Sequence, residues 1–122
     1  MTVQELYEKI GGDFNAAKKI LPSDALVARF VVKLLKDGSI QKLRDGVAAG
    51  DSKAIFEGAH ALKGVTANLG LTTLSDLAAE IADEYRPGRE RTLSDDELGA
   101  KIDELNAKFD STSEEIERFQ AQ

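Results

Sequence analysis

The stretch AHALKGVTANLG, residues 59–70, contains the only histidine of the chain, His60, and a glycine at position 64. Apolar residues recur in and before it at spacings of three and four, which is typical of an amphipathic helix. Asp51 is a good N-cap ahead of this stretch, and Gly70 is a good C-terminal stop. The stretch therefore predicts a helix from about Asp51 to Leu69. Gly64 lies inside this helix, although an interior glycine costs about 1 kcal/mol relative to alanine.

A rotation of about 100° per residue divides this helix into two sides. The side expected to face the core carries Ile55, Gly58, Leu62, Val65, Thr66 and Leu69. The opposite side carries His60 together with Lys53, Phe56, Glu57, Lys63, Gly64 and Ala67. His60 is therefore expected to face solvent. It would have an exposed phenylalanine one turn before it, and a lysine and a bare glycine one turn after it.

The neighbours of His60 favour a functional histidine over an ordinary surface residue. An exposed phenylalanine beside an exposed glycine is unusual on a solvated helix face, whereas glycine lets the backbone of a partner approach closely. Lys63 can reach over the imidazole and supply positive charge and hydrogen-bond donors. A neutral imidazole is a nucleophile near neutral pH. The pattern indicates a histidine that carries an anion, most simply a phosphoryl group, and meets a protein partner.

Helical patterns continue on both sides of this stretch. Short helices are expected over residues 2–10 and 13–20, the first ended by Gly11-Gly12. From the Ser23 cap, an apolar stripe runs to residue 49 and crosses a turn sequence at residues 37–39, and we favour a single bent helix there. A helix over residues 71–86 ends before Pro87-Gly88, and residues 87–93 are a polar loop. Residues 94–97 form a capping box that opens the last helix.

These patterns predict an all-α fold, an antiparallel up-down four-helix bundle with short additional N-terminal helices. Residues 23–122 would form the bundle and residues 1–22 would pack against it, so that the 122 residues make one domain overall. The short length favours a free-standing protein.

Composition excludes several classes of protein. The chain has no cysteine, and therefore neither disulfides nor thiolate metal sites. It has no apolar run of the roughly 20 residues that span a bilayer, and its N-terminus lacks the pattern of a signal peptide. We therefore expect a soluble, cytoplasmic protein. The formal net charge of -6 argues against nucleic acid as a main partner.

The sequence His60-Ala61-Leu62-Lys63-Gly64, followed by Asn68-Leu69-Gly70, resembles the HxLKG…NLG signature of histidine-containing phosphotransfer (HPt) domains. Gly50-Asp51 and Leu74 also fit the family, and the resemblance covers about residues 23–119. It implies a four-helix bundle that accepts a phosphoryl group from an aspartate on one receiver domain and passes it to an aspartate on another. Two positions depart from the family. Val65 stands where serine is frequent and Leu71 where alanine is common, which argues against hydroxyl assistance at the site.

The resemblance implies a role for each residue of the histidine face. His60 would be the phosphoacceptor, Lys63 would stabilise the phosphoryl oxygens, and Gly64 would leave room for the receiver. The expected docking face consists of Gly64, Phe56, Glu57, Lys53 and Ala67. The partners would be receiver domains of response regulators or hybrid sensor kinases, bound by a monomer.

The chain is predicted to be a phosphocarrier and not a kinase, because it has neither a GxxxxGK[ST] motif nor a kinase-type glycine loop. Glu57 alone would be a weak magnesium site. We therefore expect no cofactor on this chain, and Mg²⁺ on the partner receiver. A helical module that binds a partner through the His60 face without chemistry is the alternative, and His60 phosphorylation discriminates the two. A bundle that binds a metal or haem is disfavoured, because it would need several inward-facing ligands, whereas the only histidine is expected to face solvent.

Overall fold

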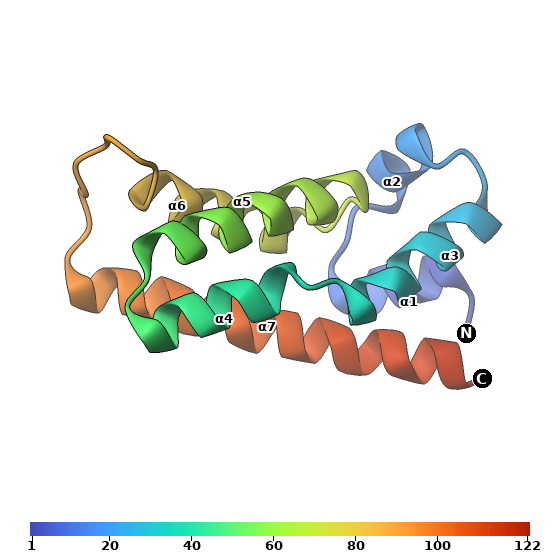
Figure 1. Ribbon diagram of the computed structural model, residues 1–122. Coiled ribbons are helices and arrows are strands. Elements are labelled where there is room, and N and C mark those ends of the chain that lie inside the picture. The colour runs from blue at the N-terminus through green and yellow to red at the C-terminus, as the bar shows by residue number, and fades with distance from the viewer.

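The computed structural model describes all 122 residues, and every regular element is helical (Figure 1). In chain order the elements are α1 (Val3–Ile10), α2 (Phe14–Ile20), α3 (Asp24–Lys33), the 3₁₀ turn η1 (Leu34–Lys36), α4 (Ser39–Ala49), α5 (Ser52–Asn68), α6 (Thr72–Glu84) and α7 (Asp95–Ala121). The predicted all-α class is confirmed. None of these helices combines the length and apolarity needed to cross a membrane.

Side-chain caps open five of the helices at the positions that the sequence predicts. In each case the side chain of the N-cap residue accepts a hydrogen bond from the backbone N–H three residues later; these caps are Thr2, Asp13, Ser23, Asp51 and Ser94. Thr2 and Ser94 belong to complete capping boxes. Local chemistry thus fixes where these helices begin.

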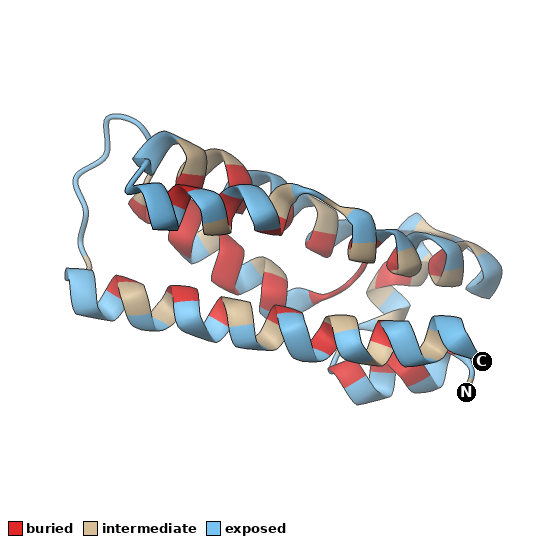
Figure 2. Cartoon of the chain, turned by 60° about the horizontal axis from the view of Figure 1, so that its bottom comes forward, coloured by how far each residue is buried: buried red, intermediate tan, exposed pale blue.

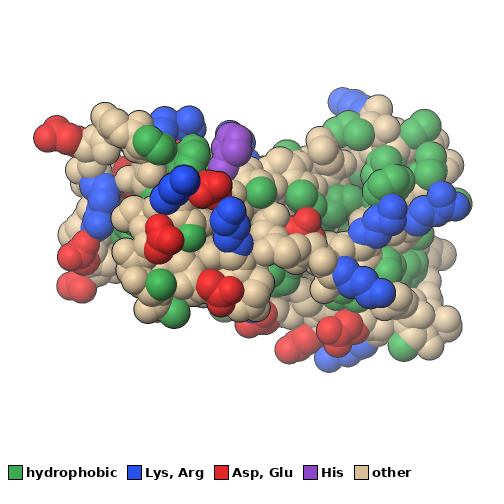
Figure 3. Space-filling view, viewed as in Figure 1, with side chains coloured by type: hydrophobic (Ala, Val, Ile, Leu, Met, Phe, Trp, Pro, Cys, Tyr) green, Lys and Arg blue, Asp and Glu red, His purple; other side chains and the backbone are tan.

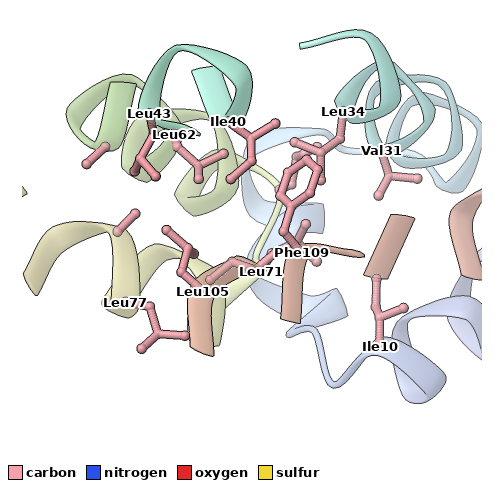
Figure 4. Close-up of a cluster of buried hydrophobic side chains, with 14 of the residues drawn as sticks. Ile10, Val31, Leu34, Ile40, Leu43, Leu62, Leu71, Leu77, Leu105 and Phe109 are labelled. Atoms are coloured by element: carbon pink, nitrogen blue, oxygen red, sulfur yellow. The ribbon is translucent and has the colours of Figure 1, made fainter. Parts of the chain in front are cut away.

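The single bent helix expected over residues 23–49 is wrong. Helix α3 ends at Lys33 and passes through η1 to Asp37, whose backbone is extended with ψ at 133°. The Asp37 carboxylate accepts a hydrogen bond from the Ser39 N–H at 3.0 Å, which stabilises the turn before α4. The apolar stripe nevertheless continues, because Leu34 and Ile40 are both buried in the same core (Figure 4). The stripe therefore reflects a shared core and not a continuous helix.

One hydrophobic core joins all the helices of the chain. Leu62 of α5, Leu77 of α6 and Leu105 of α7 point into it from three sides (Figure 4). Helix α7 runs along the whole molecule and packs against α1, α3 and α6. The buried surfaces of the helices turn inward and leave their outer faces exposed (Figure 2). The helices thus form a helical bundle that leaves one face of α5 exposed.

The N-terminal segment fixes the C-terminal end of α5. The buried Tyr7 hydroxyl donates a hydrogen bond to the Leu69 carbonyl at 2.6 Å, and burial raises the pKa of the Tyr7 phenol. The Asp13 N–H donates to the Gly70 carbonyl at 2.7 Å. Gly70 has a φ of +68°, and a Cβ there would lie 2.3 Å from the Asp13 carbonyl oxygen. Only glycine fits this position, because the positive φ is unfavourable for other residues and there is no space for a Cβ.

Glycines bring α4 and α5 into close contact. A Cβ on Gly58 would lie 2.6 Å from the backbone nitrogen of Leu43 and 2.9 Å from its Cα. A Cβ on Gly46 would lie 2.8 Å from the backbone nitrogen of Ile55. Backbone atoms cannot move aside as a flexible side chain can. The two helices are therefore in contact at both glycines, and this contact fixes the N-terminal half of α5.

Replacing Gly58 by alanine is expected to destabilise the protein by about 1–3 kcal/mol, because the added methyl group overpacks the contact with Leu43. This loss should outweigh the gain in helix propensity of about 1 kcal/mol. Urea denaturation measures the change. Gly64→Ala is the matched control in the same helix, since its Cβ would meet no atom within 4 Å, and it should be as stable as the parent or more so. A Gly58→Ala variant as stable as the Gly64→Ala variant would contradict the close contact.

Candidate functional site

His60 lies on the outer face of α5 and is exposed, as the helical rotation predicts. Its neighbours Ala59 and Leu62 are completely buried, so the helix presents the imidazole away from the core. In the space-filling view, His60 stands at the upper edge of the molecule, with hydrophobic and basic side chains beside it (Figure 3). A partner can therefore reach the ring without any rearrangement of the backbone.

Phe56 differs from the expectation of an exposed phenylalanine. The side chain is half-buried and packs against the core, although helical rotation places it on the same side of α5 as His60. The rings of Phe56 and His60 are stacked, with centroids 5.5 Å apart and an interplanar angle of 18°. Phe56 thus supports the imidazole from one side.

Lys63 and Gly64 follow His60 by one turn. Gly64 is exposed, and a Cβ there would meet no atom within 4 Å, so the space above it is open. Lys63 is half-buried, and its backbone carbonyl accepts hydrogen bonds from the hydroxyls of Thr66 and Ser75, each at 3.2 Å. The backbone of Lys63 is thereby held in place, and the charge of its side chain acts on the Asp83 carboxylate of α6.

The outer members of the expected docking face lie farther from His60. Lys53 and Ala67 are exposed, but each is seven residues from His60, or about 10 Å along the helix axis. Glu57 is half-buried and its carboxylate lies 3.4 Å from the ammonium nitrogen of Lys42 on α4. These two residues and His60 line an open groove between α4 and α5. Glu57 is therefore engaged with a lysine of its own chain.

Val65 is half-buried and packs against the core, which agrees with its expected place on the core side of α5. It lines an apolar groove whose other members are Ile20, Leu21, Phe30, Asn68 and Leu69. Ile20 and Phe30 are 54% and 37% exposed. The short helix α2 and the start of α3 do not cover this part of α5 fully. Thr66, next in the chain, is buried, and its hydroxyl donates to the Leu62 carbonyl at 2.7 Å and so faces away from His60.

Two residues beside the α5 face were not predicted: Asp83, which lies on α6, and Arg86, which follows it. Arg86 follows α6, and its Cζ lies 5.6 Å from the ring centroid of Phe56. Asp83 accepts a hydrogen bond from Arg86 Nη2 at 2.9 Å. This bond, with the charges of Arg86, Arg89 and Lys63, lowers the pKa of the Asp83 carboxyl. The site therefore has a cationic border on the α6 side, which includes Lys63.

The arrangement combines an exposed nucleophilic imidazole, nearby cations and an open approach over Gly64. These features suit the temporary attachment of an anionic group to the ring, with charge stabilisation from Lys63. No cluster of three or more His, Cys, Asp or Glu side chains is close enough together to hold a metal ion.

A family model described as the Hpt domain matches residues 26–120, which include all of α4, α5 and α6 and most of α7. No curated protein and no solved structure matches the chain. The match extends over most of the sequence and includes His60 and its surroundings.

Proposed function

From the premise that the chain belongs to the Hpt domain family, we propose that it accepts a phosphoryl group on His60 from a receiver aspartate and relays it to the aspartate of another receiver. Hpt domains carry out histidine phosphotransfer in phosphorelays, as phosphocarriers rather than kinases, and interact with receiver domains of response regulators. The observation that supports His60 as the phosphoacceptor is its exposure on α5 beside the open space over Gly64.

The transfer forms one bond and breaks one bond at phosphorus. The unprotonated ring nitrogen of His60 attacks the phosphorus of the aspartyl phosphate, the P–O bond to the aspartate breaks, and the aspartate leaves as a carboxylate. An aspartate of the second receiver then attacks the phosphohistidine and releases the ring. Such a transfer depends on alignment and charge stabilisation. Lys63 stabilises the phosphoryl oxygens, and the receiver supplies Mg²⁺.

The proposal extends to the arrangement of the helices, the oligomeric state and the docking face. Residues 23–122 form an antiparallel up-down four-helix bundle in which α3 and α4, separated by η1, together make up the first helix, and residues 1–22 pack on it as part of one domain. The chain works as a cytoplasmic monomer and docks the receiver through Gly64, Phe56, Glu57, Lys53 and Ala67. Gly64 gives this docking face its closest approach, because nothing in the chain lies within 4 Å of a Cβ there.

The proposal is tested by phosphotransfer profiling against every receiver domain of the source organism. Each receiver is phosphorylated, mixed with this chain, and the chain is separated and examined for acid-labile label. We expect rapid labelling from at least one receiver and passage of the label to a second. Receivers that bind the chain without ever labelling it would contradict the proposal and support the alternative, a non-catalytic interaction module that uses the His60 face.

Lys63→Ala is expected to slow transfer roughly tenfold, equivalent to about 1.4 kcal/mol, without abolishing it. The reason is that Lys63 is one of several cations at the phosphoryl group, and the receiver supplies the others. Rapid-quench measurement of receiver-to-His60 transfer gives the rate, and the lifetime of the phosphohistidine is measured in the same samples. Lys9→Ala is the control, since it removes the same charge from an exposed position on α1. An unchanged rate and lifetime would remove Lys63 from the site.

A further inference from the structure

The ring of Phe56 connects His60 to a residue outside α5. On α5 it stacks against His60 with centroids 5.5 Å apart, and it is also 5.6 Å from the guanidinium carbon of Arg86. Arg86 in turn donates a hydrogen bond to Asp83 at 2.9 Å. Asp83, Arg86, Phe56 and His60 therefore form a continuous row of contacts from α6 to the exposed imidazole.

The row restricts a side chain that would otherwise be free to rotate. An exposed histidine on a helix has more than one allowed rotamer, and its ring torsion is broad. Stacking at 18° limits the ring of His60 to orientations nearly parallel to that of Phe56. Phe56 is half-buried and packs against the core, so its own rotation is limited on the inner side. Arg86 restricts it further, because its guanidinium is attracted to the face of the Phe56 ring.

Arg86 is itself held by fixed groups. Its hydrogen bond to Asp83 orients the guanidinium. The far end of the loop that follows Arg86 is bound to Glu84, the last residue of α6. The Glu84 side chain is only 4% exposed and accepts hydrogen bonds from the N–H groups of Thr92 and Leu93 at 2.9 and 2.8 Å. The chain that follows α6 is thus tied back to the end of that helix. The backbone position from which the Arg86 side chain contacts Phe56 is therefore restricted.

We propose that Arg86 is a positioning residue that acts through Phe56 to hold the imidazole of His60 in the orientation that in-line transfer requires. The effect on the transfer rate rests on the proposed phosphotransfer function. The orientation of the His60 ring is independent of that function. Displacements of about 1 Å at reacting atoms are enough to slow a transfer strongly. A fixed imidazole therefore raises the rate of the chemical step without adding any contact to the phosphoryl group.

The orientation of the ring is tested by proton NMR of the chain alone. His60 is the only histidine, so its carbon-bound ring protons give the only histidine signals. At about pH 9, where an imidazole is neutral, stacking on Phe56 should displace these signals from their positions in the urea-unfolded chain. Arg86→Ala and Phe56→Leu should move them toward the unfolded positions, and Arg86→Lys should restore most of the displacement. Arg29→Ala is the control, since it removes the same charge from an exposed position on α3, outside this row of contacts, and should leave the signals unmoved.

The effect on transfer is tested with the same variants and a receiver that labels the parent. Arg86→Ala should lower the transfer rate at saturating receiver several-fold and leave the half-saturating receiver concentration unchanged. Arg86→Lys should recover most of the rate, and Arg29→Ala should match the parent.

Two results would overturn the inference. The first is an Arg86→Ala variant whose histidine signals stay at the parent positions. The second is a raised half-saturating concentration with an unchanged maximal rate, which would assign Arg86 to docking. A parent chain that no receiver labels would contradict the proposed function instead, and the NMR comparison would still decide whether Arg86 positions the ring.

Discussion

Replacing His60 by glutamine is expected to abolish acid-labile labelling of the chain by a phosphorylated receiver. The chain has no other histidine, and glutamine has no nucleophilic ring nitrogen. Folding should change little, because exposed substitutions usually alter the free energy of unfolding by no more than about 0.5 kcal/mol. Labelling is measured after rapid mixing, and helix content and melting temperature are measured by circular dichroism on the same preparation.

The comparison depends on a folded variant. Equal helix content and a melting temperature close to that of the parent show that the loss of label is chemical. If the folded glutamine variant still takes up acid-labile label, the phosphoacceptor is not His60, and the proposed function of the α5 face would be wrong.

Replacing Gly64 by glutamine is expected to stabilise the fold and to slow phosphotransfer about a hundredfold. A Cβ at position 64 meets no atom of the chain within 4 Å, and glutamine is a better helix former than glycine, so the free energy of unfolding should rise by up to about 1 kcal/mol. The same side chain would stand one turn from His60 and hold the backbone of the receiver away. Transfer requires the reacting atoms about 3–3.5 Å apart, and a displacement of 1 Å can cost about a hundredfold in rate.

Gly99→Gln is the matched control for this experiment. Gly99 is another helical glycine with nothing within 4 Å of an added Cβ, but it lies on α7. The two variants should gain similar stability by thermal melting, and only the Gly64 variant should lose transfer rate. A Gly64→Gln variant that transfers at the parent rate would show that this glycine does not clear space for a receiver.

Local sequence signals were sufficient for most of the secondary structure. Caps such as Asp51 and Ser94 act over three residues, so the helix starts could be predicted from the neighbouring residues alone. The break after α3 was missed because two signals disagreed there. The turn chemistry of Asp37 acts on the backbone, whereas the stripe from Leu34 to Ile40 depends only on which side chains reach the core.

In the candidate site, too, some features follow from local sequence and others depend on tertiary packing. The residues of α5 share a face by helical periodicity alone, so the exposure of His60 and Gly64 could be predicted. The burial of Phe56 could not, because it depends on how closely neighbouring helices approach. The contact with Arg86 depends on how α5 and α6 are aligned. The sequence does contain a signal for this contact. Phe56 and Arg86 are each 15 residues from Leu71, which lies in the turn between the two helices. Positions equally far from such a turn lie side by side when the two helices pack antiparallel.

The close contacts along α5 have a consequence for the thermodynamics of partner binding. Gly58 packs on the backbone of Leu43 in the N-terminal half of the helix, and Leu69 and Gly70 accept hydrogen bonds from Tyr7 and Asp13 at its C-terminal end. The backbone that carries the binding face is therefore ordered before any partner arrives. Association with a rigid surface loses conformational entropy only in the side chains that become immobilised, at about 0.5–1.5 kcal/mol for each rotamer-rich side chain. A smaller interface is then sufficient for specific binding, because little of its contact energy is consumed in ordering the helix.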